Sequence, residues 1–192
     1  MKIIFASNNA HKLFEIQSAL GDAFKLVSLS DIGFEEEIPE TGNTLEANAL
    51  QKAGTIFSRY KTPVFADDSG LEIEALNGAP GVDTAHYSGN RDAVANMNKV
   101  LAGLKNASNR KAKFRTVIAF VTHKSEHLFQ GEVAGSISTK MRGDGGFGYD
   151  PIFIPENEHR TFAEMTNEEK ANQSHRVRAL EKFTAYLKSN VK

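Results

Sequence analysis

Two adjacent carboxylates, Asp67 and Asp68, are the residues in this sequence that most clearly suggest chemistry. They follow Pro63-Val64-Phe65, a short apolar run that predicts a buried strand ending at the carboxylates. Ligands of open α/β sheets bind beyond the carboxyl ends of the strands. Adjacent carboxylates repel each other, so a cation is expected beside them, and oxygen ligands suit a hard ion such as Mg²⁺. The alternative is a polar Asp-Asp-Ser-Gly turn without a ligand, because these residue types form turns.

A second polar segment, Ser7 to Lys12, follows the apolar run Ile3 to Ala6 and precedes a helical pattern. This order predicts a strand, a loop and the N-terminus of a helix, where free backbone N–H groups favour phosphate. Lys12 in the first turn is mildly unfavourable for the helix dipole, which favours a bound anion. Helix capping by a serine or asparagine, without any ligand, is the alternative.

The helix predicted after Thr44 carries a lysine at the edge of its apolar face. With about 100° per residue, Lys52 projects within roughly 20° of Leu45. A lysine in such a place needs a partner or must extend its ammonium group to water, and the second state is the more common one. Glu40, in the loop before this helix, is a candidate to join Asp67 and Asp68 as a metal ligand.

The segment from Arg142 to Pro151 has four glycines in six residues, which lets the backbone approach another group closely. Phe147 and Tyr149 lie within this glycine frame, where a flat ligand has room to stack, and a flexible loop is the alternative. In the last helix, Arg176 falls inside the apolar stripe, and a guanidinium directed inward usually has a partner.

Composition restricts the class of protein. The chain has 192 residues, enough for one sizeable domain, and its net charge of −1 gives no global attraction to nucleic acid or an anionic membrane. The absence of cysteine excludes disulfides and thiol catalysis and is compatible with a reducing cytosol. No segment is long enough for a signal peptide or a membrane span. The basic segment 106–115 predicts a solvated loop entering a strand, and a nucleic-acid patch is the alternative.

Strands are also predicted over Thr116 to Thr122 and His127 to Ile137, and the short connection between them favours a hairpin. Near the C-terminus, Thr166 or Asn167 is the predicted cap of one helix, and Ser174 is the predicted cap of the last helix.

Six segments carry a family pattern when they are taken in order. They are Ser7–Lys12, then Thr41-Gly42 with Asn48-Ala49 and Lys52-Ala53, then Asp67–Leu71 with Gly78–Val82, then Gly146–Pro151, then Thr161–Met165, and finally Glu169-Lys170 with Ser174-His175-Arg176. Together they resemble the inosine triphosphate pyrophosphatase family, whose members hydrolyse non-standard purine nucleoside triphosphates. Each segment alone is weakly specific, but six in the right order, from Ser7 to Leu180, are a strong signal.

The resemblance implies a two-lobed α/β fold with a long mixed β-sheet flanked by helices and a nucleotide cleft between the lobes. It implies one domain over residues 1–192, a homodimer, and a cytoplasmic enzyme that binds neither nucleic acid nor membrane. The implied reaction is Mg²⁺-dependent hydrolysis of ITP, dITP or XTP to the monophosphate and pyrophosphate. The alternatives are a related pyrophosphatase for modified or pyrimidine nucleotides, or a non-catalytic nucleotide- or RNA-binding module.

The resemblance also assigns roles to residues. It makes Asp68 the catalytic carboxylate and a metal ligand, with Glu40 as a further metal ligand. The implied contacts to the phosphates are Ser7, Asn9, Lys12, Lys52 and Ser69. Asn8, Ala10 and His11 of the same loop are further implied substrate-binding residues. The implied contacts to the base and sugar are Phe147, Gly148, Tyr149, Asp150, Lys170, His175 and Arg176.

Two positions depart from the family pattern. His86 stands where the family usually has arginine, and Met141 stands where proline is common. The first change puts in doubt what a full charge does at residue 86, and the second should affect only the local stiffness of the loop.

Overall fold

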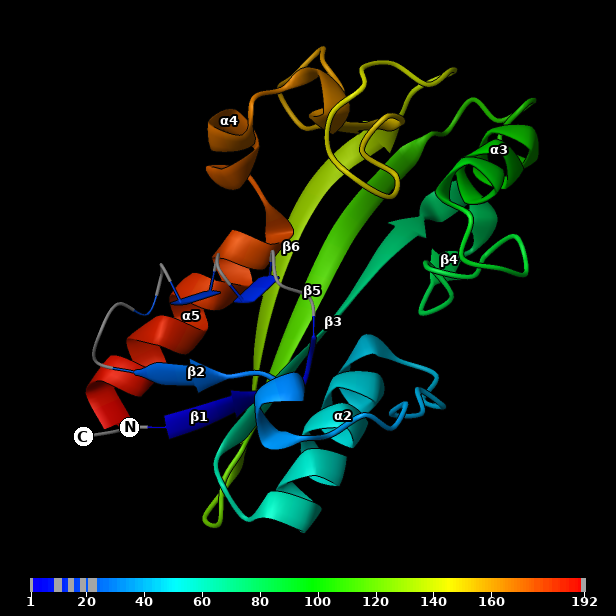
Figure 1. The fold of residues 1–192 in the computed structure, drawn as a ribbon. Coiled ribbons are helices and arrows are strands. Elements are labelled where there is room, and N and C mark those ends of the chain that lie inside the picture. Colours follow the sequence, from blue (N-terminus) through cyan, green and yellow to red (C-terminus); the bar gives the residue numbers. More distant parts are fainter. Residues whose placement is uncertain (1, 9–11, 14–15, 18–19, 21–23, 191–192) are drawn as a thin grey trace. The chain divides into compact units, whose positions relative to one another are not determined.

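The computed structural model describes residues 2–8, 12, 13, 16, 17, 20 and 24–190. In this part of the chain, seven strands form one sheet in the order β2-β1-β3-β5-β6-β7, with β4 paired to β3 (Figure 1). β1 pairs in parallel with β2 and β3, whereas β4 and β7 pair antiparallel with β3 and β6. The strands are β1 Lys2–Phe5, β2 Lys25–Val27, β3 Val64–Ile73, β4 Pro80–Gly81, β5 Lys111–Val121, β6 Glu126–Ile137 and β7 Phe153–Pro155. The predicted α/β class with a mixed sheet flanked by helices is confirmed.

Helices α2, α4 and α5 begin at predicted caps. Thr44 accepts a hydrogen bond from the backbone N–H of Ala47, a cap that is typically worth about 1 kcal/mol. Thr166 caps α4, and the hydroxyl of Ser174 accepts from the N–H of Val177 at the start of α5. The α-helices are α2 Leu45–Tyr60, α3 Ala93–Gly103, α4 Asn167–Ala171 and α5 His175–Asn190, and the 3₁₀ helices are η1 Ser30–Ile32, η2 Glu74–Leu76 and η3 Phe162–Glu164.

The chain forms two compact units. The first contains residues 1–68, 116–131 and 178–192, and the second contains residues 69–115 and 132–177. β3, β5, β6 and α5 each contribute residues to both units. One domain over residues 1–192 stays a prediction.

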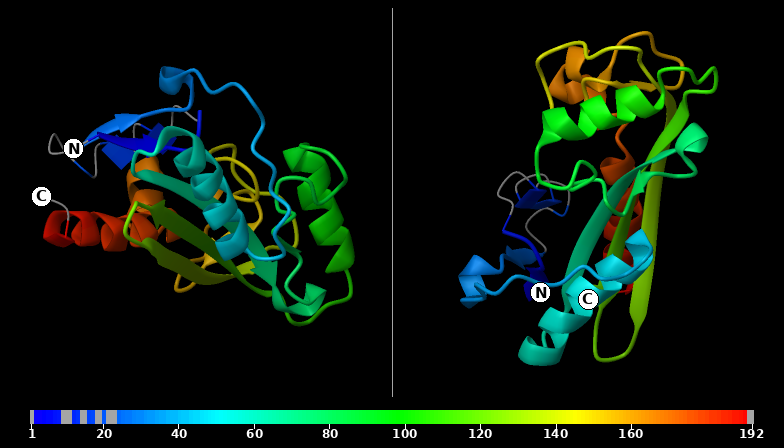
Figure 2. Two further views of the ribbon diagram at one scale, coloured as in Figure 1. Left: turned by 90° about the horizontal axis from the view of Figure 1, so that it is seen from below. Right: turned by 90° about the vertical axis from the view of Figure 1, so that its right-hand side faces the viewer.

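Within the first unit, α2 and α5 lie on opposite sides of the strands (Figure 2). Phe65 of β3 and Phe120 of β5 belong to the cluster that Leu180, Phe183 and Leu187 of α5 complete. Successive side chains of a strand point to opposite faces, so the residues next to Phe65 in β3 and next to Phe120 in β5 point to the other face, where α2 lies. The predicted apolar stripes of α2 and α5 are therefore buried against opposite faces of the same strands.

Within the second unit, one face of the sheet packs against α3 and against the residues around η3. Its cluster joins Ile73 of β3 and Phe114 of β5 to Val100 of α3, and also contains Phe153 and Phe162. This core anchors the segment from Arg142 to Pro151, because Tyr149 within it and Ile152 directly after it are buried in the cluster.

The prediction that the strand ends at Asp67 and Asp68 is wrong, because β3 continues without interruption to Ile73. Its parallel pairing with β1 stops at Phe65, where β1 itself ends, and pairing with β4 begins at Leu71. The pairings before and after the Asp-Asp-Ser-Gly segment, together with β5 as the other neighbour of β3 in the sheet, keep it extended and override its tendency to turn. The two carboxylates still lie just beyond the carboxyl end of a parallel strand, which here is β1.

The expectation of a loop over residues 106–115 is only half correct, since β5 begins at Lys111. Arg110 is not a free basic residue, because its guanidinium donates to the carbonyls of Leu104, Ile137 and Ser138. The predicted hairpin is confirmed, with β5 and β6 adjacent in the sheet and the N–H of Thr122 donating to Ser125. In the described part of the chain, no helix combines the length and the apolar character that crossing a bilayer requires.

Candidate active site

Asp67 and Asp68 point to opposite faces of β3, so each meets a different lysine. The ammonium nitrogen of Lys12 lies 2.9 Å from Oδ1 and 2.7 Å from Oδ2 of Asp67. The ammonium nitrogen of Lys52 lies 3.2 Å from Oδ1 of Asp68. Each carboxylate therefore has its own lysine, because neighbouring side chains in an extended strand diverge. A metal ion beside Asp67 and Asp68 stays a prediction.

Asp68, Lys52 and Glu40 form a group that we call the carboxylate–lysine site. Oε2 of Glu40 lies 3.1 Å from the Lys52 ammonium nitrogen, which is thus held between two carboxylates. The side chains of Lys52 and Asp68 are each only 12% exposed. Oδ2 of Asp68 is buried and has no hydrogen-bond partner among the described residues. A buried carboxylate oxygen without a partner is costly, so this oxygen is a natural ligand for a cation or a proton.

Burial and the neighbouring charges set the protonation of this site. Burial raises the pKa of Asp68 from 3.8 to about 6, with Lys52 opposing the rise and Glu40 adding to it. For Lys52, burial favours the neutral amine, but the carboxylates of Asp68, Glu40 and Asp67 outweigh it and raise the pKa of Lys52. Lys52 is therefore a permanent cation beside a carboxylate that titrates close to neutral pH.

This raised pKa predicts how the metal-free protein responds to pH. A carboxyl with a raised folded-state pKa stabilises the fold below its unfolded pKa, and this contribution is lost as pH rises through the folded value of about 6. At about pH 7.5 in EDTA, we expect Asp68→Asn to be more stable than the wild type by about 1–3 kcal/mol. The difference should disappear near pH 4. Thermal unfolding of both proteins across this range checks it, and a less stable variant at pH 7.5 would show that burial does not destabilise the charged carboxylate.

The segment Ser7 to Lys12 is only partly described. Ser7 follows β1 and is half-buried, and the side-chain oxygen of Asn8 accepts hydrogen bonds from the backbone N–H and hydroxyl of Ser30. Asn9, Ala10 and His11 lie outside the described residues. Ser69 follows Asp68 within β3 and is half-buried. Contacts of these residues to phosphate stay predictions.

A second group, which we call the aromatic site, lies in the second unit and consists of Phe147, Asp150, Lys170 and Arg176. The Phe147 ring is 63% exposed, with the Lys170 ammonium 4.8 Å and the Arg176 guanidinium 5.6 Å from its centre. The buried Asp150 carboxylate accepts from the N–H of Phe147 and from Lys170, so it holds both in place. A Cβ at Gly146 would lie 2.1 Å from Asp150 Oδ2, and its φ is +75°, so glycine is required there.

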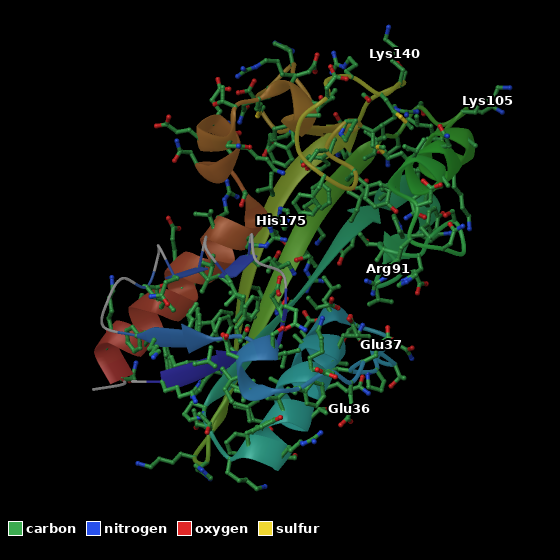
Figure 3. All side chains as sticks on the ribbon, viewed as in Figure 1. Glu36, Glu37, Arg91, Lys105, Lys140 and His175 are labelled. Carbon is green, nitrogen blue, oxygen red and sulfur yellow. The ribbon has the colours of Figure 1, made fainter. Side chains whose placement is uncertain are left out.

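Two other predicted residues of this group are buried. Tyr149 is 3% exposed, its hydroxyl donates to the Thr84 carbonyl, and burial raises the pKa of Tyr149. His175, at the start of α5 (Figure 3), stacks on Phe114 with ring centres 4.8 Å apart. Of the two aromatic residues in the glycine frame, only Phe147 therefore offers an exposed ring. Contacts of Gly148, Tyr149 and His175 to the substrate stay predictions.

The histidine that replaces the family's arginine has a basic neighbour. Nε of Arg91 donates to Nε2 of His86 at 2.9 Å, and both side chains are exposed (Figure 3 labels Arg91). Because a guanidinium only donates, this bond places the proton of neutral His86 on Nδ1. Arg91 therefore supplies a full positive charge next to position 86.

Sequence reasoning gave no site role to Asn48, which is 2% exposed and lies against Asp68. The available signal was its spacing, four residues before Lys52 on the same helix face. Its partner Gly42 was not predictable from that spacing, since the contact joins a loop to a helix.

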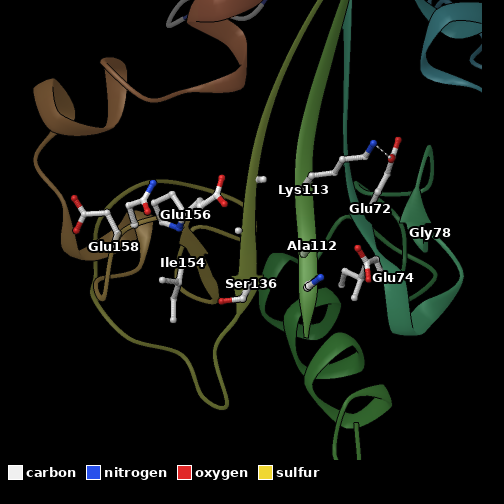
Figure 4. A pocket seen from close by; sticks show the side chains of 15 residues that line it. Glu72, Glu74, Gly78, Ala112, Lys113, Ser136, Ile154, Glu156 and Glu158 are labelled. Carbon is white, nitrogen blue, oxygen red and sulfur yellow. Dashed lines mark ion pairs between the residues drawn. The ribbon is translucent and has the colours of Figure 1, made fainter. Parts of the chain in front are cut away.

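A groove of about 720 Å³ in the second unit contains none of the predicted site residues. It is lined by β3, β5, β6, β7 and the turn after β7, and Lys113 points toward Glu72 across it (Figure 4). Glu72 also pairs with Arg115, and Lys113 with Glu132. These charges neutralise one another, which is typical of a solvated sheet face.

The fold and the site together define a mixed α/β protein with a buried carboxylate–lysine site at the carboxyl end of a parallel strand. The chain belongs to the Ham1 family, whose sequence profile matches residues 3–186. It is 48% identical over 190 residues to the dITP/XTP pyrophosphatase of Flavobacterium psychrophilum, covering 98% of this chain and all of the relative. It is 49% identical over 188 residues to the protein of the same name from Porphyromonas gingivalis, covering 97% of each. The Ham1 protein of Staphylococcus aureus superposes with a TM-score of 0.94 at 35% identity, over 98% of this chain and 99% of that one.

Proposed function

We propose that this protein hydrolyses non-standard purine nucleoside triphosphates, namely ITP, dITP and XTP, to the monophosphate and pyrophosphate. The reaction removes these nucleotides from the cellular pool. The observation that carries the proposal is the buried Asp68 carboxylate, with one unpartnered oxygen, beside the permanent cation Lys52. Relatives named for this activity match over nearly the whole chain, which supports the same substrate class.

The residues present fit a magnesium ion. Asp68 and Glu40 offer oxygen ligands only, which suits a hard cation, and Oδ2 of Asp68 lacks a partner. No group of three or more Asp, Glu or His side chains with metal-site spacing occurs among the described residues. Two carboxylates are nevertheless usual for Mg²⁺, which takes further oxygens from phosphates and water. When bound, the ion would neutralise negative charge on the phosphates and polarise them.

The chain's own residues account for the remaining steps. Lys52 and Lys12 would hold the phosphate oxygens by charge, each released in part from its carboxylate partner. Asp68 would accept the proton of the attacking water with its carboxylate, which burial makes more basic than an ordinary aspartate in the metal-free protein. The water oxygen bonds to phosphorus, the bond between the α and β phosphates breaks, and pyrophosphate leaves.

We assign base recognition to the aromatic site. The exposed Phe147 ring is a stacking surface, and the cations beside it, Lys170 and Arg176, are hydrogen-bond donors. Hypoxanthine and xanthine present an accepting 6-oxo group, whereas adenine presents a donating 6-amino group. A donor that faces a donor leaves buried polar groups unpaired, and sites of this kind discriminate strongly. Such a site rejects ATP but not GTP, which shares the 6-oxo group.

The proposal predicts that Arg176→Ala lowers the preference for ITP over ATP. We expect the ratio of the two kcat/KM values to fall by about tenfold or more, because one donor of the discriminating pair is lost. Steady-state kinetics with both substrates check this, and Arg178→Ala, an exposed arginine two residues further along α5, is the matched control. An unchanged ITP to ATP ratio in the Arg176 variant would count against the assigned role.

A substrate panel tests the function as a whole. With Mg²⁺ present, ITP, dITP and XTP should each give monophosphate and pyrophosphate in equal amounts, and CTP and UTP should react slowly. Fast turnover of a pyrimidine nucleotide would favour the related pyrophosphatase, and binding without turnover would favour a nucleotide-binding module. We further propose a cytoplasmic homodimer without nucleic-acid or membrane partners, as the family resemblance implies.

A further inference from the structure

A buried asparagine, Asn48, lies one helical turn before Lys52 in α2 and is only 2% exposed. Residues four apart share a helix face, so Asn48 and Lys52 lie on the same side of α2. We propose that Asn48 is a positioning residue that holds both carboxylates of the metal site in place. The inference rests on the proposed function, since it assumes that Glu40 and Asp68 bind the metal ion.

Asn48 fixes the loop that carries Glu40. Its side-chain oxygen accepts from the backbone N–H of Gly42 at 2.7 Å. The preceding backbone N–H, of Thr41, donates to the side chain of Gln51 at 3.0 Å. Two successive backbone groups directly after Glu40 are thus tied to side chains of α2, which restricts where the Glu40 carboxylate can go.

The loop approaches α2 so closely that no side chain fits at Gly42. A Cβ there would lie 2.7 Å from the Cβ of Ala47 and 2.8 Å from Oδ1 of Asn48. Gly42 and Asn48 are therefore two halves of one contact, and a change in either should displace the same loop.

The other end of the Asn48 amide faces Asp68. Because a backbone N–H only donates, Oδ1 must face Gly42, and the NH₂ group is left for other partners. The Asn48 amide is within interaction range of the Asp68 carboxylate and favours its charged form. Asn48 therefore hydrogen-bonds to the loop that carries Glu40 and interacts electrostatically with Asp68. Such neighbours of metal ligands typically change metal affinity by about 10–100-fold when they are removed.

The test is a double-mutant cycle of Asn48→Ala and Gly42→Ala in the full chain. The first readout is the rise in Tm of the substrate-free protein as MgCl₂ is added, and the second is the Mg²⁺ concentration for half-maximal ITP hydrolysis. We expect each variant to bind Mg²⁺ about tenfold or more weakly, with kcat at saturating Mg²⁺ close to the wild type. The double variant should bind Mg²⁺ no more weakly than the weaker-binding single variant does, because both substitutions break the same contact.

Matched controls are Asn43→Ala, in the same loop but exposed, and Gly54→Ala, where an added Cβ meets nothing within 4 Å. Both should bind Mg²⁺ as the wild type does. Asn48→Ser replaces Asn48→Ala in the cycle if the alanine variant does not fold.

The outcomes separate this inference from the proposed function. If the Asn48 variant melts earlier in EDTA but keeps wild-type Mg²⁺ affinity, Asn48 supports only the fold, and the inference is overturned. If the two losses of Mg²⁺ affinity multiply in the double variant, Asn48 and Gly42 act independently, and the inference is also overturned. If the wild type itself gains no stability from Mg²⁺ and does not hydrolyse ITP, the proposed function fails and this inference fails with it.

Discussion

Asp68→Asn is expected to lower kcat for ITP hydrolysis by about 10²–10³ or more, while the substrate remains bound. The amide keeps the size and shape of the side chain but can neither accept the proton of water nor bind a metal ion as a carboxylate does. KM should change much less than kcat, because Lys12 and Lys52 still bind the phosphates. Pyrophosphate release measured over a range of ITP concentrations gives both constants.

Asp83→Asn is a suitable control for this loss, since Asp83 lies outside both sites. We expect its kcat to stay within about twofold of the wild type, as for most surface substitutions. Near-normal turnover by the Asp68 variant would show that the catalytic carboxylate lies elsewhere.

Lys52→Met should reduce both stability and activity, because it removes the cation between two carboxylates. Breaking a buried ion pair by removing one partner leaves an uncompensated charge, and the usual loss is about 3–5 kcal/mol. Glu40 is partly exposed and can turn toward water, so we expect a loss near the lower end, about 3 kcal/mol at pH 8 without metal. Denaturant unfolding in EDTA measures this difference.

A double-mutant cycle assigns the loss to Asp68. In the Asp68→Asn background, the same Lys52→Met change should be less destabilising by about 1–2 kcal/mol, because no buried carboxylate is left without a partner. Equal effects in both backgrounds would mean that Lys52 contributes through packing of its hydrocarbon chain instead of its charge.

Local patterns predicted the helical part of the site well. Lys52 at the edge of the apolar stripe of α2 follows from 3.6-residue periodicity, and the structure confirms it. Of the two candidate caps of this helix, Asn43 and Thr44, the structure uses Thr44. The same holds for the Thr166 and Ser174 caps, because capping depends only on residues within one turn.

The strand that carries the carboxylates was misjudged because its conformation depends on distant segments. Asp-Asp-Ser-Gly taken alone favours a turn, but β3 pairs with β1 before it and with β4 after it, and β5 is its other neighbour in the sheet, so the strand stays extended. Only an extended strand sends Asp67 and Asp68 to opposite faces, so their separate lysine partners did not follow from their adjacency. Asn48 was passed over for a related reason, since its partner Gly42 belongs to a loop whose path no periodic pattern describes.

The residue types of the aromatic site were predicted from the sequence, but which of its two aromatic rings is exposed was not. Two aromatic residues in a glycine frame look equivalent in sequence, yet Tyr149 enters the core and Phe147 stays exposed. The difference comes from the Thr84 carbonyl, 65 residues earlier, which accepts the Tyr149 hydroxyl.

A crystal structure with Mg²⁺ and a non-hydrolysable α,β-methylene analogue of ITP tests the central claim most directly. We predict a magnesium ion bound by Asp68, with Glu40 as a further ligand, and phosphate oxygens in contact with both the ion and the Lys52 ammonium. An Asp68 carboxylate that faces bulk solvent, with the phosphates bound elsewhere, would contradict the role of Asp68 and Lys52 in catalysis.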